Sequence, residues 1–528
     1  MQSSQPPSSP SDRTARAVVL GLLCSLPALL SLRVAVACVA DADLGWHLRA
    51  GEWILQHHAF PHADPFSRVG SLPWQAYSWL FELILLRFYQ WWNVSGFMVY
   101  TSILLVLIGA ALYHLLSRLQ TDFTKCALLA VAATVCMSRG FTPRPWLFSI
   151  LFFTLQLDIL MHARRTGKIR ELLWLPLIYL VWVNVHIQFI DGLIVLGLAA
   201  IEPLLARWWK TGDQRPPARA LWLTLGASLL ATCINPYGPG IYKIAHDLAA
   251  QPGVLNTVSE MNALPFRSIP DYLVLFLCLG AAAVLARARN FPPFETLLLA
   301  AAAAISFKSQ RDVWFMALTA VTILAAGLPG RPEKLSQPAE KTSLPRWALL
   351  ISAAAAAACV FACALILHVN NTHLNRQLAK IMPVQAVDVI RERHYQGPIF
   401  NNYAWGGFLI WNLRQPVSID GRAALYGDAR IDRSRATWAG GPDWASDPDL
   451  TSAGIVIAPD DQPLTQLLRT DARFQLAYQD KIASVFIARK TPAQPPIIVP
   501  AGPAADTVAS VSNAAHTAWR KDNADSTE

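Results

Sequence analysis

Charged residues are scarce in this sequence. Only 15% of its 528 residues are charged, whereas 54% are hydrophobic. An average soluble domain carries about 25% charged residues. The chain is therefore too apolar for an ordinary soluble protein, and it is too long for one ordinary domain. We predict a polytopic membrane protein.

The sequence also lacks a long basic stretch of the kind that binds nucleic acid. Its formal net charge is +9, but Lys and Arg stand in short clusters between apolar runs. The positive-inside rule of membrane proteins accounts for such clusters without a polyanionic partner. We therefore exclude nucleic-acid binding.

Cysteines are few, and none has a metal-site spacing with histidine partners. All of them lie in apolar segments or at their ends, which predicts buried packing residues rather than disulfides. The eight cysteines are Cys24, Cys38, Cys126, Cys136, Cys233, Cys278, Cys359 and Cys363.

The N-terminal segment 1–16 is polar, and its composition predicts a disordered cytoplasmic N-terminus. The apolar run 17–40 is long enough to cross a bilayer and is interrupted only by Arg33. The residues "AVA" at 35–37 are compatible with a cleaved signal peptide, but the length of the run favours an uncleaved anchor. In all, about eleven runs are long enough, or nearly so, to be spans. They are 17–40, 96–117, 124–139, 145–162, 171–187, 190–206, 218–235, 272–288, 293–307, 312–328 and 346–369.

The basic loops between these runs set the expected orientation. The positive-inside rule places 164–171, 207–219, 286–290 and 331–346 in the cytoplasm, with the N-terminus inside and the C-terminus outside. This threading requires that the aromatic segment 77–92 lies at the membrane interface instead of crossing. Five segments then face the extracytoplasmic side, namely 41–75, 138–145, 182–192, 233–240 and 307–312.

The composition changes after the last span. Residues 383–490 predict a small extracytoplasmic α/β domain that follows a membrane domain at 17–370. The tail 491–528, rich in Pro, Ala, Ser and Asn, predicts disorder. Within the small domain we expect a helix at 383–393 and strands at 407–413, 416–419, 454–458 and 482–488.

Two aspartates at the end of the first span are the first candidates for chemistry. Asp41 and Asp43 precede an amphipathic helix that carries Leu44, Leu48 and Trp53. A carboxylate here is close to hydrocarbon yet wet, which can raise its basicity or let it share a metal ion with a phosphate. The structural alternative is an ordinary charged span end with Asp41 as a helix N-cap. The loop 41–76 is, however, longer and more aromatic than a passive connection needs.

The pattern in this loop resembles a group of bacterial polytopic proteins related to the GT-C glycosyltransferases. It comprises an Asp-x-Asp-x-x-Trp-His-x-x-x-Gly segment, then Pro-x-x-Asp-Pro-Phe-Ser, Pro-Trp and Trp-Leu-x-Glu. Further marks of the resemblance are "TPRPWLFS" (142–149), "WVNVHIQF" (182–189), "INPYG" (234–238), "SQRDVWF" (309–315), "NNYAWGGFLIW" (401–411) and "SIDGRAALYG" (418–427). In that superfamily, which includes protein O-mannosyltransferases and lipid A aminoarabinose transferases, the first extracytoplasmic loop opens with an acidic catalytic or metal-binding motif.

The resemblance implies a mainly α, GT-C-like transmembrane helix bundle in a bacterial inner membrane, with interfacial helices and a small C-terminal α/β domain. It also implies transfer of a sugar from a polyprenyl-phosphate-linked donor to an extracytoplasmic glycan, lipid or protein. Asp41 and Asp43 are the candidate catalytic base. A divalent cation, Mg²⁺ or Mn²⁺, that bridges them to a phosphate fits this chemistry, although the sequence shows no complete ligand set.

The candidate substrate-binding residues are polar side chains in the segments expected to face outward. Arg144, Lys308 and Arg311 are placed to bind the donor phosphate or, equally, to neutralise lipid headgroups or pair with Asp312. Asn184 and His186 lie near the end of a span, where polar residues usually face a cavity. The remaining candidates are His47, Asp420 and Arg422, the last two being equally compatible with a local ion pair.

Two other classes stay open. A transporter or flippase of lipid-linked glycans also needs outward cavities, but the sequence shows no paired inverted half-repeats. A non-catalytic GT-C-like scaffold in envelope assembly would keep the fold without the chemistry. Only the enzyme requires the acidic and basic candidates to converge around one cavity.

Overall fold

The structure is a computed structural model that describes residues 10–70, 72–208, 217–250, 258–288, 292–330, 345–489 and 497–498. It divides into two compact units. The helical unit comprises Met1–Val34, Tyr77–Ile84 and Met98–Leu367, and the mixed unit comprises Ala35–Ala76, Leu85–Phe97 and His368–Glu528. The loop 41–76, which the sequence assigns to the membrane domain, thus groups with the C-terminal residues. Of the predicted basic loops 207–219, 286–290 and 331–346, residues 209–216, 289–290 and 331–344 lie outside the described residues.

Each predicted span contains a helix. The helices are α1 (Pro10–Arg33), α5 (Ser95–Leu119), α6 (Phe123–Met137), α7 (Trp146–Thr166), α8 (Trp174–Val185), α9 (Phe189–Trp208), α10 (Ala218–Thr232), α13 (Ile269–Ala286), α14 (Pro293–Lys308), α15 (Val313–Gly327) and α16 (Arg346–Ile366). Among the described residues, six helices are long and apolar enough to cross a membrane, namely α1, α5, α6 with its short extension, α7, α13 and α16. The protein is a multi-pass membrane protein.

Several predicted spans fall short of a bilayer. The helices α8, α10, α14 and α15 have 12, 15, 16 and 15 residues. At 1.5 Å per residue these lengths correspond to about 18–24 Å, less than the ~30 Å of a hydrocarbon core. α15 packs against α13, α14 and α6, and most of its side chains are buried. The positions of the eleven predicted runs are therefore confirmed as helices, and these four helices are among those that only nearly reach the length of a span.

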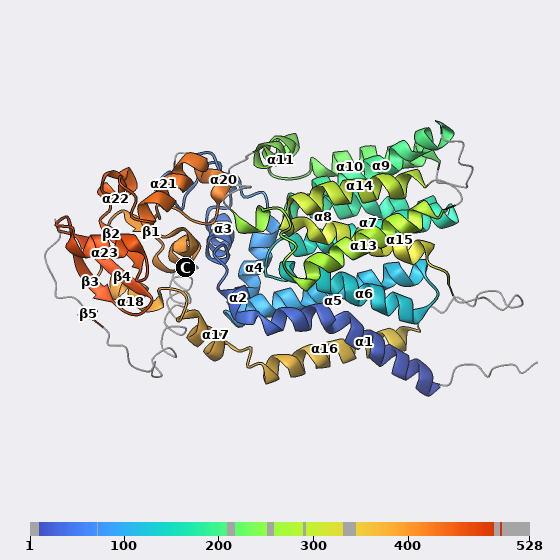
Figure 1. The fold of residues 1–528 in the computed structure, drawn as a ribbon, viewed down its shortest axis with the longest axis horizontal. Helices are drawn as coiled ribbons and strands as arrows, with labels where there is room; N and C mark the ends of the chain where they lie inside the picture. Colours follow the sequence, from blue (N-terminus) through green and yellow to red (C-terminus); the bar gives the residue numbers. More distant parts are fainter. Residues whose placement is uncertain are drawn as a thin grey trace, which may run out of the picture. The chain divides into compact units, whose positions relative to one another are not determined.

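The first helix differs at both ends from the prediction. α1 begins at Pro10, inside the segment 1–16 that the sequence predicts to be disordered, and it ends at Arg33 instead of reaching residue 40. The next residues form the separate short helix α2 (Ala35–Val39). α1 runs beside α16 (Figure 1) because small residues let the two backbones approach: a Cβ on Gly21 would clash with the Ser352 carbonyl oxygen.

The helical unit has two ends of different character. At one end, which we call the junction end because four segments of this unit join there, 138–145, 182–192, 233–240 and 307–312 contact one another. Arg139 donates to Gln310 at 2.8 Å, Gln188 to Asp312 at 2.5 Å, and Asn184 to the Ile234 carbonyl oxygen at 3.0 Å. These segments were predicted to face one compartment, and the structure brings them together.

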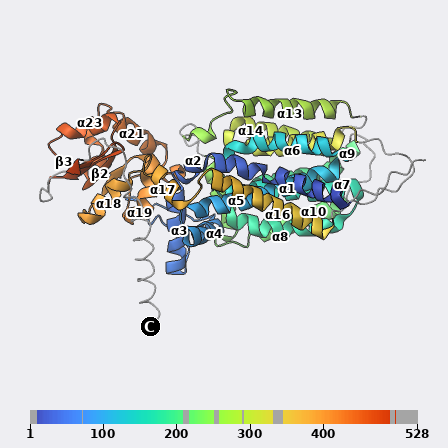
Figure 2. The same ribbon diagram turned by 90° about the horizontal axis from the view of Figure 1, so that it is seen from below.

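The opposite, basic end gathers the starts of α1, α6 and α14 with the ends of α5, α7 and α15. Arg16 lies over the Phe123 ring at 5.6 Å, and Arg164 pairs with Glu295 at 3.0 Å. Arg165 donates to the carbonyl oxygens of Leu119 and Ala326 at 2.8 and 3.1 Å. Figure 2 shows α13 beside α14 and α6 along the same bundle.

The mixed unit contains a five-stranded sheet in the order β1-β2-β4-β3-β5. Its strands are β1 (Ile399–Asn401), β2 (Ile455–Pro459), β3 (Phe474–Gln479), β4 (Ala483–Ala488) and β5 (Ile497–Ile498). β2 pairs parallel with β1 and antiparallel with β4, with Val456 opposite Phe486. The helices α21 (Asp428–Trp438), α22 (Pro448–Thr451) and α23 (Pro463–Thr470) supply Trp438, Leu450, Leu464 and Leu468 to the core on this sheet.

The structure confirms only some of the predicted elements of this domain. The helix at 383–393 is α18 (Val384–Glu392), and the strands at 454–458 and 482–488 are β2 and β4. The segment 407–413 is not a strand but part of the helix α19 (Gly406–Leu413), and 416–419 forms only one isolated bridge, from Val417 to Ser67. β5 lies inside the predicted disordered tail 491–528, and the remaining tail residues lie outside the described part of the chain.

Candidate active site

Asp41 and Asp43 lie on the turn that leads into α3 (Leu44–His57). The Asp43 backbone N–H donates to Asp41 Oδ1 at 2.9 Å, so the Asp41 carboxylate orders this turn. Asp43, not Asp41, is the N-cap residue of α3, and its side chain makes no capping hydrogen bond. The alternative of Asp41 as the N-cap is therefore wrong. The Asp43 carboxylate sits at a helix N-terminus, where the helix dipole favours negative charge.

The Asp43 carboxylate also lies against the backbone of Gly421, in the "IDGR" segment of the same unit. A Cβ built on Gly421 would clash with Asp43 Oδ1, so only glycine leaves the carboxylate in place. Tyr403 Oη donates to the Gly421 carbonyl oxygen at 3.0 Å and holds this backbone. The acidic motif of the first loop and a motif nearly 380 residues later thus form one local structure.

A second close approach joins the same two parts of the chain. A Cβ on Gly45 would clash with the Gly407 carbonyl oxygen, and a Cβ on Gly407 would clash with the Ala42 carbonyl oxygen. α3 therefore packs directly on α19 through two glycines. This packing fixes the helix whose N-terminus carries Asp43.

Arg422 forms the centre of a buried ion network beside this contact. Its Nη1 donates to Asp64 Oδ1 at 2.6 Å, and its Nη2 and Nε donate to the two Asp420 oxygens at 2.7 and 2.9 Å. Asp64 also accepts from the backbone N–H groups of Phe66 and Ser67 at 3.0 and 3.1 Å. This two-pronged geometry is specific to a guanidinium. The network ties the first loop to the "IDGR" segment.

Three aromatic rings enclose the Arg422 guanidinium. It lies 4.9 Å from the Trp74 ring, 5.4 Å from Phe66 and 5.9 Å from Trp46. Such contacts stabilise a cation that has lost its water. Asp420 is 0% and Arg422 7% exposed, and the structure shows the ion pair that the sequence left as the alternative to substrate contact.

Asp420 and Arg422 are held in their ionised forms. Burial raises the pKa of Asp420, but Arg422 and the hydrogen bonds from Arg422 and Tyr426 outweigh burial and hold it below its ordinary value. Burial lowers the pKa of Arg422, and Asp420 more than reverses this effect. Burial, with the Asp420 charge, raises the pKa of Tyr426 well above its ordinary value. Arg422 and Asp420 therefore act as a fixed charged support.

His47 lies one turn into α3 and is 4% exposed. Its ring lies against the Trp46 ring, tilted by 33° with 3.6 Å between the centroids. Burial, and then the nearby Arg422 charge, lower the pKa of His47 well below its usual range. The imidazole is therefore neutral at pH 7, and any contact with a substrate would be a neutral hydrogen bond.

In the helical unit, Asn184 and His186 are buried at the end of α8. The Asn184 side chain accepts from Trp79 Nε1 at 2.7 Å and donates to the Leu180 and Ile234 carbonyl oxygens at 2.8 and 3.0 Å. His186 Nδ1 lies 2.7 Å from Ser149 Oγ, to which Trp182 Nε1 donates at 2.8 Å. These bonds give both residues a structural role at the junction end, and their contact with substrate stays a prediction.

The three predicted phosphate-binding cations also lie at the junction end. Arg144 is half-buried before α7, with its guanidinium 5.4 Å from the Trp146 ring. Lys308 is exposed at the last turn of α14. Arg311 Nε lies 3.9 Å from Asp312 Oδ1, the pair that the sequence offered as the alternative. Gln188 Nε2 also donates to Asp312 Oδ1, so Arg311 and Gln188 share this carboxylate.

The candidates thus fall into two groups. Asp41, Asp43, His47, Asp420 and Arg422 come together within the mixed unit, whereas the other five lie at the junction end of the helical unit. Convergence of the two groups around one cavity stays a prediction.

Sequence reasoning missed several supporting residues of the mixed unit. Asp64 and the rings of Phe66 and Trp74 belong to the Pro-x-x-Asp-Pro-Phe-Ser and Pro-Trp segments, which were noted as a pattern without roles. Gly421 and Tyr426 lie in the "SIDGRAALYG" segment. All of these residues belong to sequence segments that had been noted, but only the fold shows that they lie around Arg422.

A metal site was also expected at Asp41 and Asp43. Across the described part of the chain, no group of three or more His, Cys, Asp and Glu side chains is arranged to hold a metal ion. These two carboxylates would need oxygen ligands from a phosphate or water to complete a coordination shell. The cation stays a prediction, and no step below depends on it.

Comparison with solved structures identifies the fold. The chain is similar to the apo oligosaccharyltransferase of Archaeoglobus fulgidus, with a TM-score of 0.53 and 11% identity over 84% of this chain and 69% of that chain. The AglB oligosaccharyltransferase of the same organism, in complex with an inhibitory peptide and a dolichol-phosphate, matches with a TM-score of 0.49 and 12% identity over the same shares. ArnT from Cupriavidus metallidurans, bound to undecaprenyl phosphate, matches with a TM-score of 0.45 and 12% identity over 89% of this chain and 97% of that chain.

No protein-family model matches the chain, and no curated protein matches its sequence. The TM-score of 0.53 shows a shared fold, and an identity of 11% does not show a shared activity. Over most of its length, the chain is structurally similar to the GT-C glycosyltransferases and has a GT-C-like fold.

Proposed function

We propose that this protein is a membrane glycosyltransferase that moves a sugar from a polyprenyl-phosphate-linked donor to an acceptor hydroxyl outside the cytoplasm of a bacterial cell. One observation carries the proposal. The Asp43 carboxylate lies at the N-terminus of α3 against the Gly421 backbone, and it makes no capping hydrogen bond to the helix. A carboxylate that lies where two distant parts of the chain meet, and that does not cap its helix, is a candidate general base.

The reaction would proceed with inversion. Asp43, or Asp41 beside it, accepts the proton of the acceptor hydroxyl, and the hydroxyl oxygen forms a bond to the anomeric carbon of the donor. The bond from that carbon to the lipid phosphate oxygen breaks, and the phosphate leaves with the electron pair. Removing the proton as the bond forms contributes typically 10²–10⁴-fold to such a step.

The basic groups of the junction end would serve the leaving phosphate. Arg144, Lys308 and Arg311 would offset its negative charge, because fixed cations stabilise charge that develops in a transition state. Asn184 and His186 would stabilise the conformation of the junction end through the hydrogen bonds described above. Asp420 and Arg422 would act as positioning residues for the acidic turn, since both are buried and paired with each other.

The first test compares envelope glycans from cells with and without the protein by mass spectrometry, and then measures donor turnover by the purified protein in liposomes. We expect one glycan or lipid to lose a sugar when the protein is absent. The Gly421→Ala variant should insert normally and lose most of its turnover, because the new methyl group displaces the Asp43 carboxylate. Gly226→Ala is the control, since no atom lies within 4 Å of the added Cβ. Unchanged glycans, together with full turnover by Gly421→Ala, would leave a non-catalytic scaffold as the better account.

A further inference from the structure

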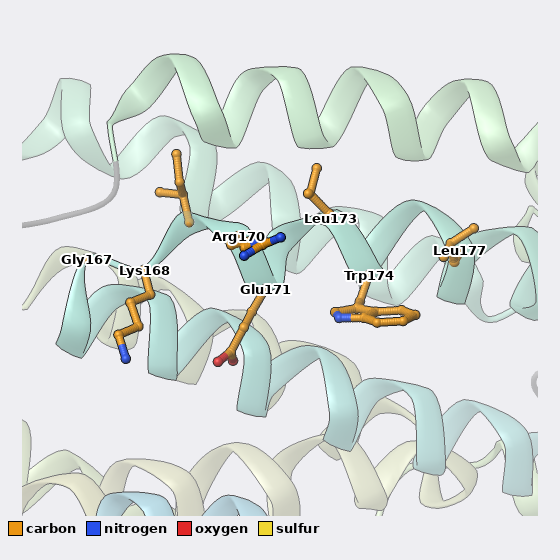
Figure 3. Close-up of a pocket in the computed structure, with 8 residues that line it drawn as sticks. Gly167, Lys168, Arg170, Glu171, Leu173, Trp174 and Leu177 are labelled. Atoms are coloured by element: carbon orange, nitrogen blue, oxygen red, sulfur yellow. The ribbon is translucent and has the colours of Figure 1, made fainter.

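The basic end of the helical unit carries a groove that the proposed reaction does not use. It surrounds the short helix η2 (Ile169–Leu173) and the first turns of α8, with a volume of about 740 Å³ (Figure 3). A second hollow of about 360 Å³ continues it between α7 and α8. Trp174 and Leu177 line both, so the two form one groove. None of the predicted site residues lines it.

The mouth of this groove is basic. Lys168 and Arg170 line it, and both side chains are exposed. In Figure 3 the Lys168 amine, the Glu171 carboxylate and the Trp174 ring project from one side of the turn, with Leu173 on the other. The groove mouth therefore offers cations beside a tryptophan, a combination typical of the membrane–water interface.

The two acidic residues that line the groove share one guanidinium. Arg118 donates to Asp158 Oδ2 at 2.6 Å and to Glu171 Oε2 at 3.0 Å. His162 Nε2 lies 3.2 Å from the other Glu171 oxygen. Arg118, Lys168 and Arg170 thus carry three positive charges against the two negative charges of Asp158 and Glu171. The mouth therefore attracts an anion.

The walls further from the mouth are apolar. Leu173, Trp174 and Leu177 are 70%, 62% and 53% exposed. Phe152, Leu155, Ile159 and Val181 continue this lining along α7 and α8. From Gly167 to Phe152 the groove follows α7 for about 22 Å at 1.5 Å per residue, which is most of the ~30 Å depth of a hydrocarbon core.

We propose that this groove is a binding site for an anionic phospholipid, with the headgroup phosphate at Lys168 and Arg170 and an acyl chain along α7 and α8. Charge and hydrophobicity change along the groove in the order in which a lipid presents phosphate and hydrocarbon. A soluble anion would leave the apolar wall uncovered. The site lies near the C-terminus of α7, whereas Ser149, which contacts His186 of the junction end, lies near the N-terminus of α7. The groove therefore belongs to the opposite membrane face.

The test measures lipid binding to the purified, delipidated full chain by native mass spectrometry. Phosphatidylglycerol and phosphatidylcholine with identical acyl chains are titrated in detergent. We expect phosphatidylglycerol to bind about tenfold more tightly, since each cation near the surface favours an anionic lipid. Lys168→Gln/Arg170→Gln should abolish this preference. The control is Arg287→Gln/Arg346→Gln, which removes two exposed cations, one at the end of α13 and one at the start of α16. This control should keep the preference for phosphatidylglycerol.

Two further arms test the nature of the occupant. Val181→Trp, which fills the apolar wall with another apolar side chain, should weaken the binding of both lipids. Soluble glycerol phosphate should not displace the bound lipid. Equal affinity for the two lipids in the unaltered protein, an equal loss in the control pair, or displacement by glycerol phosphate would each overturn the proposal. These measurements do not depend on sugar transfer, so their result tests the lipid site separately from the proposed function.

Discussion

Arg422 shows how strongly single residues determine the mixed unit. The guanidinium is buried between Asp64 and Asp420 and under three aromatic rings. The sequence could indicate a turn with two opposite charges at "IDGR", because Asp420 and Arg422 flank a glycine. It could not indicate Asp64 as a partner, since 358 residues separate Asp64 from Arg422.

Arg422→Met should strongly destabilise the mixed unit. It leaves two buried carboxylates facing each other without a cation, and breaking a buried ion pair in this way costs about 3–5 kcal/mol. The measurement is the thermal unfolding midpoint of the full chain in detergent, with limited proteolysis of residues 368–489. Arg435→Met is the matched control, because Arg435 and Asp432 are 67% and 68% exposed and 4.0 Å apart; surface pairs contribute at most about 1 kcal/mol. Equal effects of the two variants would contradict the assigned role of Arg422.

His47 should make stability depend on pH. Burial and Arg422 lower the pKa of His47 in the folded protein, whereas an unfolded histidine binds a proton near pH ~6.5. Below that pH the unfolded state takes up a proton that the folded state does not. The free energy of unfolding should therefore be intact above pH ~6.5 and fall by up to about 1.4 kcal/mol for each pH unit below it.

The pH dependence is measured as the difference between the protein and its His47→Gln variant in thermal unfolding from pH 5 to 8. The variant should show the flatter profile. His62→Gln, at an exposed position in the same loop, should leave the profile unchanged. Parallel profiles for the protein and His47→Gln would show that the ring is not buried in its neutral form.

At the scale of elements, apolar runs predict the membrane helices well because a bilayer requires long stretches of hydrophobic residues. Short apolar runs are ambiguous, and α19 is the clearest case. "GFLIWNL" is rich in aromatic and branched residues, yet Asn402 caps the preceding turn and two glycines allow the segment to pack on α3 as a helix. β1 and β5 have three and two residues, too few for a detectable alternation.

Gly45→Ala tests the packing of α3 on α19. In an isolated helix this change is favourable by about 1 kcal/mol. Here the added methyl group meets the Gly407 carbonyl oxygen, so we expect a lower unfolding midpoint and reduced sugar transfer together. Gly197→Ala in α9, where no atom lies within 4 Å of the added Cβ, should not lower the midpoint. A stabilised Gly45→Ala protein would show that the two helices do not approach closely.

At the scale of the whole molecule, the two units are interleaved in the chain. The mixed unit is built from 35–76, 85–97 and 368 onward, so the first loop and the C-terminal sheet belong to one compact unit. The sequence predicts both parts but treats them as separate domains. Neither composition nor periodicity reports on contacts such as Asp43 with Gly421 or Asp64 with Arg422.

The most direct test of the account is sugar transfer by Asp43→Asn protein in liposomes that contain a polyprenyl-phosphate-linked donor. The amide keeps the shape of the side chain and removes the base, so we predict a loss of about 100-fold or more with normal insertion and folding. Asp41→Asn should show whether the neighbouring carboxylate shares the role, and Asp461→Asn, at an exposed position, is the control. Full transfer by both Asp43→Asn and Asp41→Asn would contradict the account.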